Sequence, residues 1–112
     1  MGTFTRGDIV LFPFPYTDLS ARKLRPCLVI SETMQEDIIL CQITSQNIQK
    51  DMYSVPVTMD DTEKGSLKIN SYVRANMLFT ATIQQIVKKV CRLTDAKYTA
   101  VTKTINKIIQ KQ

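Results

Sequence analysis

The feature that most constrains the fold of this chain is a succession of short, β-forming apolar runs separated by polar or proline-containing connections. The runs are Ile9–Phe12, Pro26–Ile30, Ile38–Thr44, Tyr53–Val57, Tyr72–Val73, Leu78–Thr80 and Ile86–Leu93. Most are too short for helices and are rich in β-branched residues, so they predict strands. The last run is compatible with a strand or a helix by periodicity, and we favour a strand. The connections are Tyr16–Leu24, Gln46–Met52 and Met59–Ser66, the last with a turn at Gly65.

Prolines refine this interpretation. Pro13 and Pro15 are expected to end the first strand, because proline cannot donate to a sheet ladder. Pro56 interrupts an alternating run and indicates an edge strand or a bulge. The run Pro26–Ile30 is continuously apolar, which is typical of a strand buried on both faces.

The end of the chain has a different pattern. Thr94 can cap a helix, and Asp95 suits its positive first turn. One apolar helical face then follows at three- to four-residue spacing, made of Tyr98, Val101, Ile105, Ile108 and Ile109. Lys103, Lys107 and Lys111 form a stripe opposite. We therefore expect a single domain over residues 1–112, mainly β with a C-terminal helix, built as a small barrel or strongly curved sheet.

The composition excludes several classes of function. The 112 residues include no histidine, which rules out Ser-His-Asp hydrolysis, Cys-His proteolysis, His-based zinc sites and imidazole-driven ribonuclease chemistry. Three cysteines without a C-x-x-C pair make a disulfide framework improbable and favour a reducing, cytoplasmic environment. No stretch approaches the roughly 18 consecutive apolar residues of a membrane span, so no membrane association is expected.

The net charge of +5 is unevenly distributed. Residues 1–82 sum to −1, and residues 83–112 sum to +6. A basic segment suits an anionic partner such as nucleic acid or an acidic polypeptide. Solubility of a terminal helix is an equally good explanation of the same lysines.

Three polar groups could carry chemistry. Arg25 follows the basic residues Arg22 and Lys23 where a loop is expected to enter the sheet, and its guanidinium matches phosphate geometry. Thr44, Ser45 and Gln46 follow the third predicted strand, and Arg74 follows a valine that we expect to be buried. Each group also has a purely structural interpretation, as a surface arginine or a strand-end turn. Phe14 and Tyr16 could stack on bases, although we expect Phe14 to pack in the core.

The sequence also resembles a known family. The run from Gly7 to Ser20, followed by Lys23 to Ser31, resembles the N-terminal signature of PemK/MazF toxins. The likeness continues through Gln42–Gln46, Ser71–Ala75 and Leu78–Thr80 to the Leu93-Thr94-Asp95 entry of the final helix. It covers most of the chain, and the Arg25-Pro26 pair with its Gly7-Asp8 partner is its most specific part.

This resemblance implies an SH3-like small barrel of the PemK/MazF/CcdB type, a homodimer, an RNA substrate and a cognate antitoxin protein. It implies a sequence-selective endoribonuclease that needs no metal and no cofactor. The family's central catalytic residues correspond to Arg25 and Thr44, and Arg74 matches a further arginine used by some members. Asn76 and Ser20 stand where some members have carboxylates, so the resemblance does not identify the general base.

The chemistry of the residues agrees with that implication. RNA carries its own nucleophile, the 2′-hydroxyl, so cleavage needs a proton acceptor, charge stabilisation and protonation of the leaving oxygen. Arg25 suits charge stabilisation, Thr44 could position the phosphate, and Asp18 is the nearest carboxylate candidate for a base. Candidate RNA contacts are Tyr16, Asp18, Ser20, Lys23, Ser45, Gln46 and Asn76.

Two other functions share these features. A catalytically inactive RNA-binding or regulatory relative is suggested by Asn76 and Ser20. A gyrase-type poison on the same fold, as in CcdB-like proteins, relies on a C-terminal tryptophan, and this chain contains none.

Overall fold

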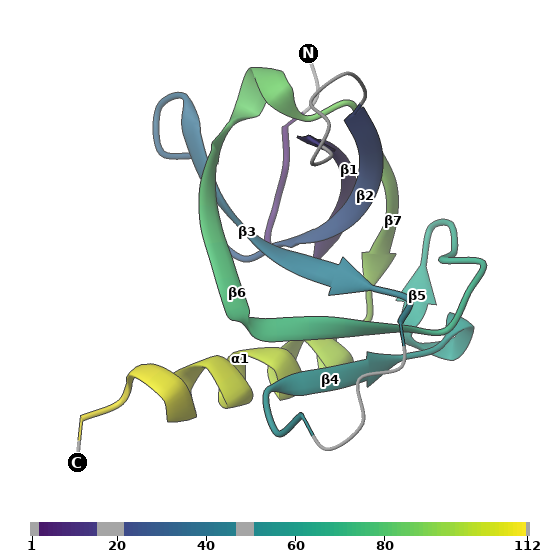
Figure 1. The fold of residues 1–112 in the computed structure, drawn as a ribbon, viewed down its shortest axis with the longest axis vertical. Helices are drawn as coiled ribbons and strands as arrows, with labels where there is room; N and C mark the ends of the chain where they lie inside the picture. Colours follow the sequence, from purple (N-terminus) through teal and green to yellow (C-terminus); the bar gives the residue numbers. More distant parts are fainter. Residues whose placement is uncertain (1–2, 16–21, 47–50, 112) are drawn as a thin grey trace.

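The computed structural model describes residues 3–15, 22–46 and 51–111. Its strands are β1 (Asp8–Pro15), β2 (Arg22–Val29), β3 (Asp37–Thr44), β4 (Ser54–Val57), β5 (Thr62–Glu63), β6 (Ser71–Thr82) and β7 (Lys88–Leu93). Short 3-10 turns, η1 (Met59–Asp61) and η2 (Ile83–Gln85), precede β5 and β7, and helix α1 (Asp95–Ile109) ends the described chain. Within these ranges the strands form one antiparallel sheet in the order β4-β6-β3-β2-β1-β7-β5. The sheet curls into a nearly closed barrel (Figure 1), which confirms the predicted fold class.

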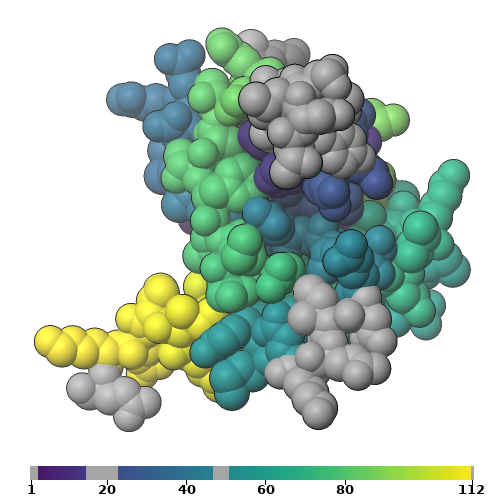
Figure 2. All heavy atoms as spheres, in the orientation of Figure 1, coloured from purple at the N-terminus to yellow at the C-terminus, as the bar shows by residue number. Residues whose placement is uncertain are grey.

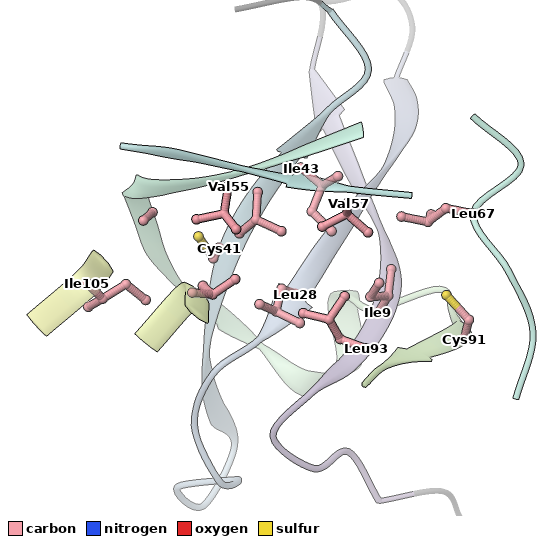
Figure 3. Packing of buried hydrophobic residues seen from close by; sticks show 13 residues of the cluster. Ile9, Leu28, Cys41, Ile43, Val55, Val57, Leu67, Cys91, Leu93 and Ile105 are labelled. Atoms are coloured by element: carbon pink, nitrogen blue, oxygen red, sulfur yellow. The ribbon is translucent and has the colours of Figure 1, made fainter. Parts of the chain in front are cut away.

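The curled sheet buries side chains on both of its faces. Along β2, Cys27, Leu28 and Val29 are all fully buried, as the continuous apolar run predicts. Leu28 belongs to a cluster that includes Val101 and Ile105 of α1. Cys27 and Val29 point into a second cluster. Figure 3 shows the first cluster, in which side chains of the strands meet those of the helix.

The first strand is longer than predicted. It continues through Pro13 and Pro15, which are in register with Leu24 and Arg22 of β2. The carbonyl of Leu11 accepts from the backbone N–H of Val87, so Leu11 directs its backbone polar groups away from β2. Pro13 and Pro15 follow it at intervals of two residues along β1 and therefore have the same orientation. Strand β7 pairs with β1 only up to Leu11, so the two prolines fall where no ladder partner needs an N–H.

The segments predicted as two short strands, Tyr72–Val73 and Leu78–Thr80, are parts of the single strand β6. Between the pairs Cys41–Leu78 and Ile43–Val73, β6 has four residues where β3 has one. This irregularity lets β6 turn a corner: β6 pairs with β3 on both sides of it, and only the part from Ser71 to Arg74 also pairs with β4 (Figure 1). A bulge of this kind increases local bending, and its polar residues make the strand look interrupted in the sequence.

The other predicted strands are confirmed with small shifts of their ends. Strand β3 adds only Asp37 to the predicted run, and β4 begins one residue later than expected. Its Pro56 lies on an edge strand of the sheet, as anticipated. The ambiguous run Ile86–Leu93 is a strand from Lys88 onward, which is β7, and a 3-10 turn precedes it. Part of the predicted Tyr16–Leu24 loop is strand instead, because β2 already begins at Arg22.

Helix α1 begins where the sequence predicts. The Thr94 hydroxyl accepts from the backbone N–H of Lys97, and Asp95 is the first helical residue. Val101 and Ile105 are buried, whereas Ile108 and Ile109 are 40% and 68% exposed. The predicted apolar face is therefore buried only as far as Ile105, and the last turn of the helix projects past the barrel (Figure 2). Among the described residues, no helix is long and apolar enough to cross a membrane.

Candidate active site

Three neighbouring strands place the candidate residues at one end of the barrel. The pairing of β2 with β3 ends at Cys27–Gln42, and Arg25 and Thr44 lie two residues further along each strand. Because residues two apart in a strand share a face, both side chains follow the same side of their strands as that last pair. Strand β6 lies on the other side of β3 and contributes Arg74 at its corner. Arg25 is thus the fourth residue of β2, whereas the sequence places it at the point where a loop enters the sheet.

A cavity of about 380 Å³ brings these three residues together. We call it the polar cavity, and its lining is Phe14, Arg25, Gln42, Ile43, Thr44, Gln46 and Arg74. Phe14 also packs edge-on against Phe12 and Phe79, so it is a half-buried residue that packs against the core, close to the expectation, and also lines the cavity. The polar cavity therefore combines two guanidinium groups, one hydroxyl, two amides and one aromatic ring.

A second cavity of about 230 Å³ adjoins the first through shared residues. Arg25, Ile43 and Thr44 line both. The rest of its lining is mixed, with Lys23, Leu24, Pro26, Ser45, Leu67, Lys68, Ile69 and Ser71. We call it the mixed cavity. Arg25 and Thr44 therefore lie at the junction of two hollows that can receive adjacent parts of one extended ligand.

The site is electropositive. Lys23, Arg25, Lys68 and Arg74 line the two cavities, and no carboxylate does so among the described residues. None of the lysines of α1 lines either cavity. The excess charge of residues 83–112 therefore does not form this site. Clustered cations next to apolar walls favour an anionic ligand such as a phosphodiester.

Thr44 has a defined local geometry. Its hydroxyl oxygen accepts from the backbone N–H of Gln46 at 3.1 Å, closing a turn at the end of β3. This bond leaves the hydroxyl hydrogen available for a ligand oxygen. Gln46 and Ser45 are exposed beside it. The polar group predicted at this strand end is therefore both a turn and part of the cavity wall.

Arg74 is held from several sides. Its backbone carbonyl accepts from the thiol of Cys41, with sulfur and oxygen 2.9 Å apart. Its Nη2 lies 3.5 Å from Oδ2 of Asp51. Its Nε is buried and has no hydrogen-bond partner among the residues that the structure describes. The Asp51 carboxyl also accepts from the backbone N–H of Tyr53 and from the Ser54 hydroxyl. These hydrogen bonds, that of Tyr53 first, lower the pKa of Asp51, and Arg74 adds to the effect.

Six of the predicted site residues line the cavities, namely Arg25, Thr44, Arg74, Lys23, Ser45 and Gln46. Asn76 is exposed on β6 and lines neither. Tyr16, Asp18 and Ser20 lie outside the described residues. Within the described ranges, no three His, Cys, Asp or Glu side chains gather as metal ligands.

Sequence reasoning missed Gln42, Lys68, Ile69 and Asp51. Gln42 could have been found, because it precedes Thr44 by two residues on the same strand and therefore shares its face. Lys68 and Ile69 lie in a connection with no strand or helix pattern. Asp51 is 23 residues from Arg74, and no local pattern relates the two.

The chain is thus a small curled β-barrel protein with two arginines and a threonine at two adjoining cavities. The family model described as PemK-like, MazF-like toxin of type II toxin-antitoxin systems matches residues 5–109. The chain belongs to that family, as its sequence suggested. None of the curated protein sequences matches it significantly.

Solved structures show the same fold at low sequence identity. A MazE–MazF crystal structure from Deinococcus radiodurans has a chain that superposes with a TM-score of 0.79 at 14% identity, over 99% of this chain and 100% of that one. An endoribonuclease in complex with its cognate antitoxin, from a mycobacterial species, gives 0.76 at 15% identity over 100% and 98%. The Mycobacterium tuberculosis toxin MazF-mt6 gives 0.68 at 15% identity over 92% and 98%.

Proposed function

We propose that this protein is the toxin of a type II toxin-antitoxin system and cleaves single-stranded RNA as an endoribonuclease. One observation carries the proposal: Arg25, Thr44 and Arg74 come from three different strands and line one cavity. A guanidinium pair suits a phosphate whose negative charge increases during reaction. The membership in the family and the endoribonucleases among its structural relatives support the same activity.

The proposed reaction uses the substrate's own 2′-hydroxyl. Its oxygen attacks the adjacent phosphorus, its proton passes to a base, and a pentacoordinate phosphorane forms. The bond from phosphorus to the 5′-oxygen then breaks, and that oxygen takes a proton. The products are a 2′,3′-cyclic phosphate and a 5′-hydroxyl. Arg25 and Arg74 stabilise the phosphorane charge, and the Thr44 hydroxyl donates to a non-bridging oxygen.

In this proposal the reaction needs no metal ion, because the nucleophile is intramolecular and the guanidinium groups supply the positive charge. Asp18 stays the candidate for the base, by its position in the sequence. The amides of Gln42 and Gln46 and the ring of Phe14 line the polar cavity, where they could hydrogen-bond to and stack on an unpaired base. Such contacts would make cleavage selective for sequence.

The proposed partners are a cognate antitoxin and a second copy of the chain, in the cytoplasm. Structural relatives are recorded in complex with an antitoxin. The electropositive cavities would suit an acidic segment that competes with RNA. Leu78, which is 39% exposed on β6, belongs to the apolar surface expected at a two-fold interface.

The experiment is cleavage of a long single-stranded transcript in excess EDTA, with both new ends characterised chemically and the 5′ ends mapped. We expect cuts at a recurring sequence that leave 5′-hydroxyl and 2′,3′-cyclic phosphate ends. Arg25→Ala should abolish cutting while circular dichroism shows the fold intact. Arg6→Ala is the matched control, since Arg6 pairs with Glu32 at the surface and should leave the rate unchanged.

A metal requirement or 3′-hydroxyl ends would reject the mechanism. If the wild-type protein cleaves no RNA substrate, the enzymatic function is rejected and a binding or regulatory function is favoured. Co-expression with the neighbouring open reading frame tests the antitoxin: relief of growth arrest is expected.

A further inference from the structure

Arg74 combines a fixed backbone with a flexible side chain. It lies at the corner of β6, in the stretch where the β3–β6 ladder is interrupted, and it pairs with Ser54 of β4. Its backbone is fixed by this pairing and by the bond from Cys41. Its side chain still has several rotatable bonds, and a guanidinium contributes to charge stabilisation only if it is already oriented toward the phosphate. Something must therefore hold the guanidinium toward the polar cavity.

The carboxyl of Asp51 meets this requirement. The backbone N–H of Tyr53 donates to its Oδ1 at 2.8 Å, and the Ser54 hydroxyl donates to its Oδ2 at 3.1 Å. The carboxyl is thus anchored in a turn immediately before β4, and its side chain is only 12% exposed. Oδ2 faces Nη2 of Arg74 at 3.5 Å. A short side chain fixed by two other donors is a rigid support for a longer and more flexible one.

We propose that Asp51 is a positioning residue for RNA cleavage, which orients the Arg74 guanidinium toward the scissile phosphate. This inference rests on the proposed function. In the sequence, Asn76 stands two residues after Arg74 where some relatives have a carboxylate. Here the acidic partner of Arg74 comes from the segment before β4 instead.

Asp51 acts through Arg74 rather than on the substrate. It lines neither cavity, so it does not contact a ligand bound there. The hydrogen bonds from Tyr53 and Ser54 lower its pKa, so it stays ionised at neutral pH and is a weak proton acceptor. A role as the general base is therefore disfavoured on both geometric and chemical grounds.

The test is Asp51→Asn measured in two backgrounds, wild type and Arg74→Ala. Asparagine keeps an oxygen for the Tyr53 N–H, removes the charge that faces Arg74, and replaces Oδ2, which also accepts from the Ser54 hydroxyl, with an amide NH2 group. With a defined cleavable transcript, we expect kcat to fall about tenfold or more and KM to change less than about threefold. In the Arg74→Ala background, Asp51→Asn should have no further effect, within about twofold. A purely structural role would lower the rate in both backgrounds.

Two further variants complete the design. Asp37→Asn is the matched control, because Asp37 is exposed at the opposite end of β3 from Thr44 and should cleave at the wild-type rate. Ser54→Ala keeps the Asp51 charge and removes one of its anchors. It should cause a smaller loss in the same direction, and it replaces Asp51→Asn if that variant does not fold.

A rate for Asp51→Asn equal to or above that of the wild type would overturn the inference, because it would show that the carboxylate merely repels RNA. A loss of the same size in the Arg74→Ala background would overturn it as well. If wild-type protein does not cut RNA, the proposed function fails separately. In that case the affinity for a fluorescein-labelled random-sequence RNA tests the positioning role. If Asp51→Asn weakens RNA binding only when Arg74 is present, the positioning role of Asp51 is supported. Unchanged or tighter RNA binding overturns it.

Discussion

The thiol of Cys41 on β3 donates a hydrogen bond to the backbone carbonyl of Arg74 on β6, with 2.9 Å between sulfur and oxygen. The bond lies where the β3–β6 ladder is irregular and where β6 turns its corner. A carbonyl released from a ladder needs another donor, and a buried thiol is a weak but adequate one. The core therefore stabilises the backbone that carries a candidate catalytic arginine.

Replacing the Cys41 thiol should lower the free energy of unfolding more than replacing the equally buried thiol of Cys27. Cys41 and Cys27 are both fully buried, and among the described residues only Cys41 has a hydrogen bond from its sulfur. We expect Cys41→Ala to lower the free energy of unfolding by about 1 kcal/mol more than Cys27→Ala, since it also leaves the Arg74 carbonyl unpaired. Urea denaturation measures both. Equal losses would mean that the Cys41 side chain contributes only its volume.

Stability should decline at alkaline pH. Burial raises the pKa of the Cys41 thiol from 9.0 to about 12, and burial together with the nearby Cys41 does the same for Cys27. Since the folded state holds these protons more tightly, their contribution is complete below pH 9 and is lost as the pH rises toward 12. The measurement is the free energy of unfolding at several values from pH 8 to 11. A Cys27→Ala/Cys41→Ala protein should lose less over that range, and an identical slope would contradict the assignment.

Asp8 should be a major determinant of stability. Its carboxylate is 3% exposed and contacts Arg92 at 2.9 Å and Lys89 at 3.2 Å, and the backbone N–H of Thr5 donates to it at 2.8 Å. We expect Asp8→Asn to cost about 2–3 kcal/mol, less than for a fully buried pair because both cations reach water. Chemical denaturation gives the value.

The surface pair of Glu32 with Arg6 is the control for that prediction. Its side chains are 74% and 54% exposed, so Glu32→Gln should cost less than about 1 kcal/mol. Comparable losses at the two positions would show that burial does not set the strength of these ion pairs.

Gly65 should tolerate no side chain. Its φ is +124°, and a Cβ there would lie 2.3 Å from the backbone oxygen of Val90 on β7. Gly7 also has a positive φ, of +98°, but a Cβ would meet only the Arg92 side chain at 3.5 Å. We expect Gly7→Ala to cost about 1–2 kcal/mol from backbone strain, and Gly65→Ala to cost more because backbone must also move. Thermal unfolding of both variants tests this order, and the reverse order would refute the explanation.

The elements predicted best are those specified by neighbouring residues. Thr94, Asp95 and the spacing of Val101 and Ile105 were sufficient to place the helix, because capping and amphipathic periodicity act within a few turns. The strand β3 was predicted almost to its ends for the same reason. The family likeness, confirmed over residues 5–109, also depended on runs of adjacent residues.

The residue types that could do chemistry are evident from the composition alone. Without histidine, arginine, threonine and carboxylates were left, and Arg25, Thr44 and Arg74 were singled out before any fold was known. The folded arrangement was needed to show that these three share a cavity, that β6 is one bent strand, and that Asp51 faces Arg74 across 23 residues of sequence. The physical reason is that strand order and ladder irregularities depend on contacts between distant segments, which no local pattern of side chains specifies.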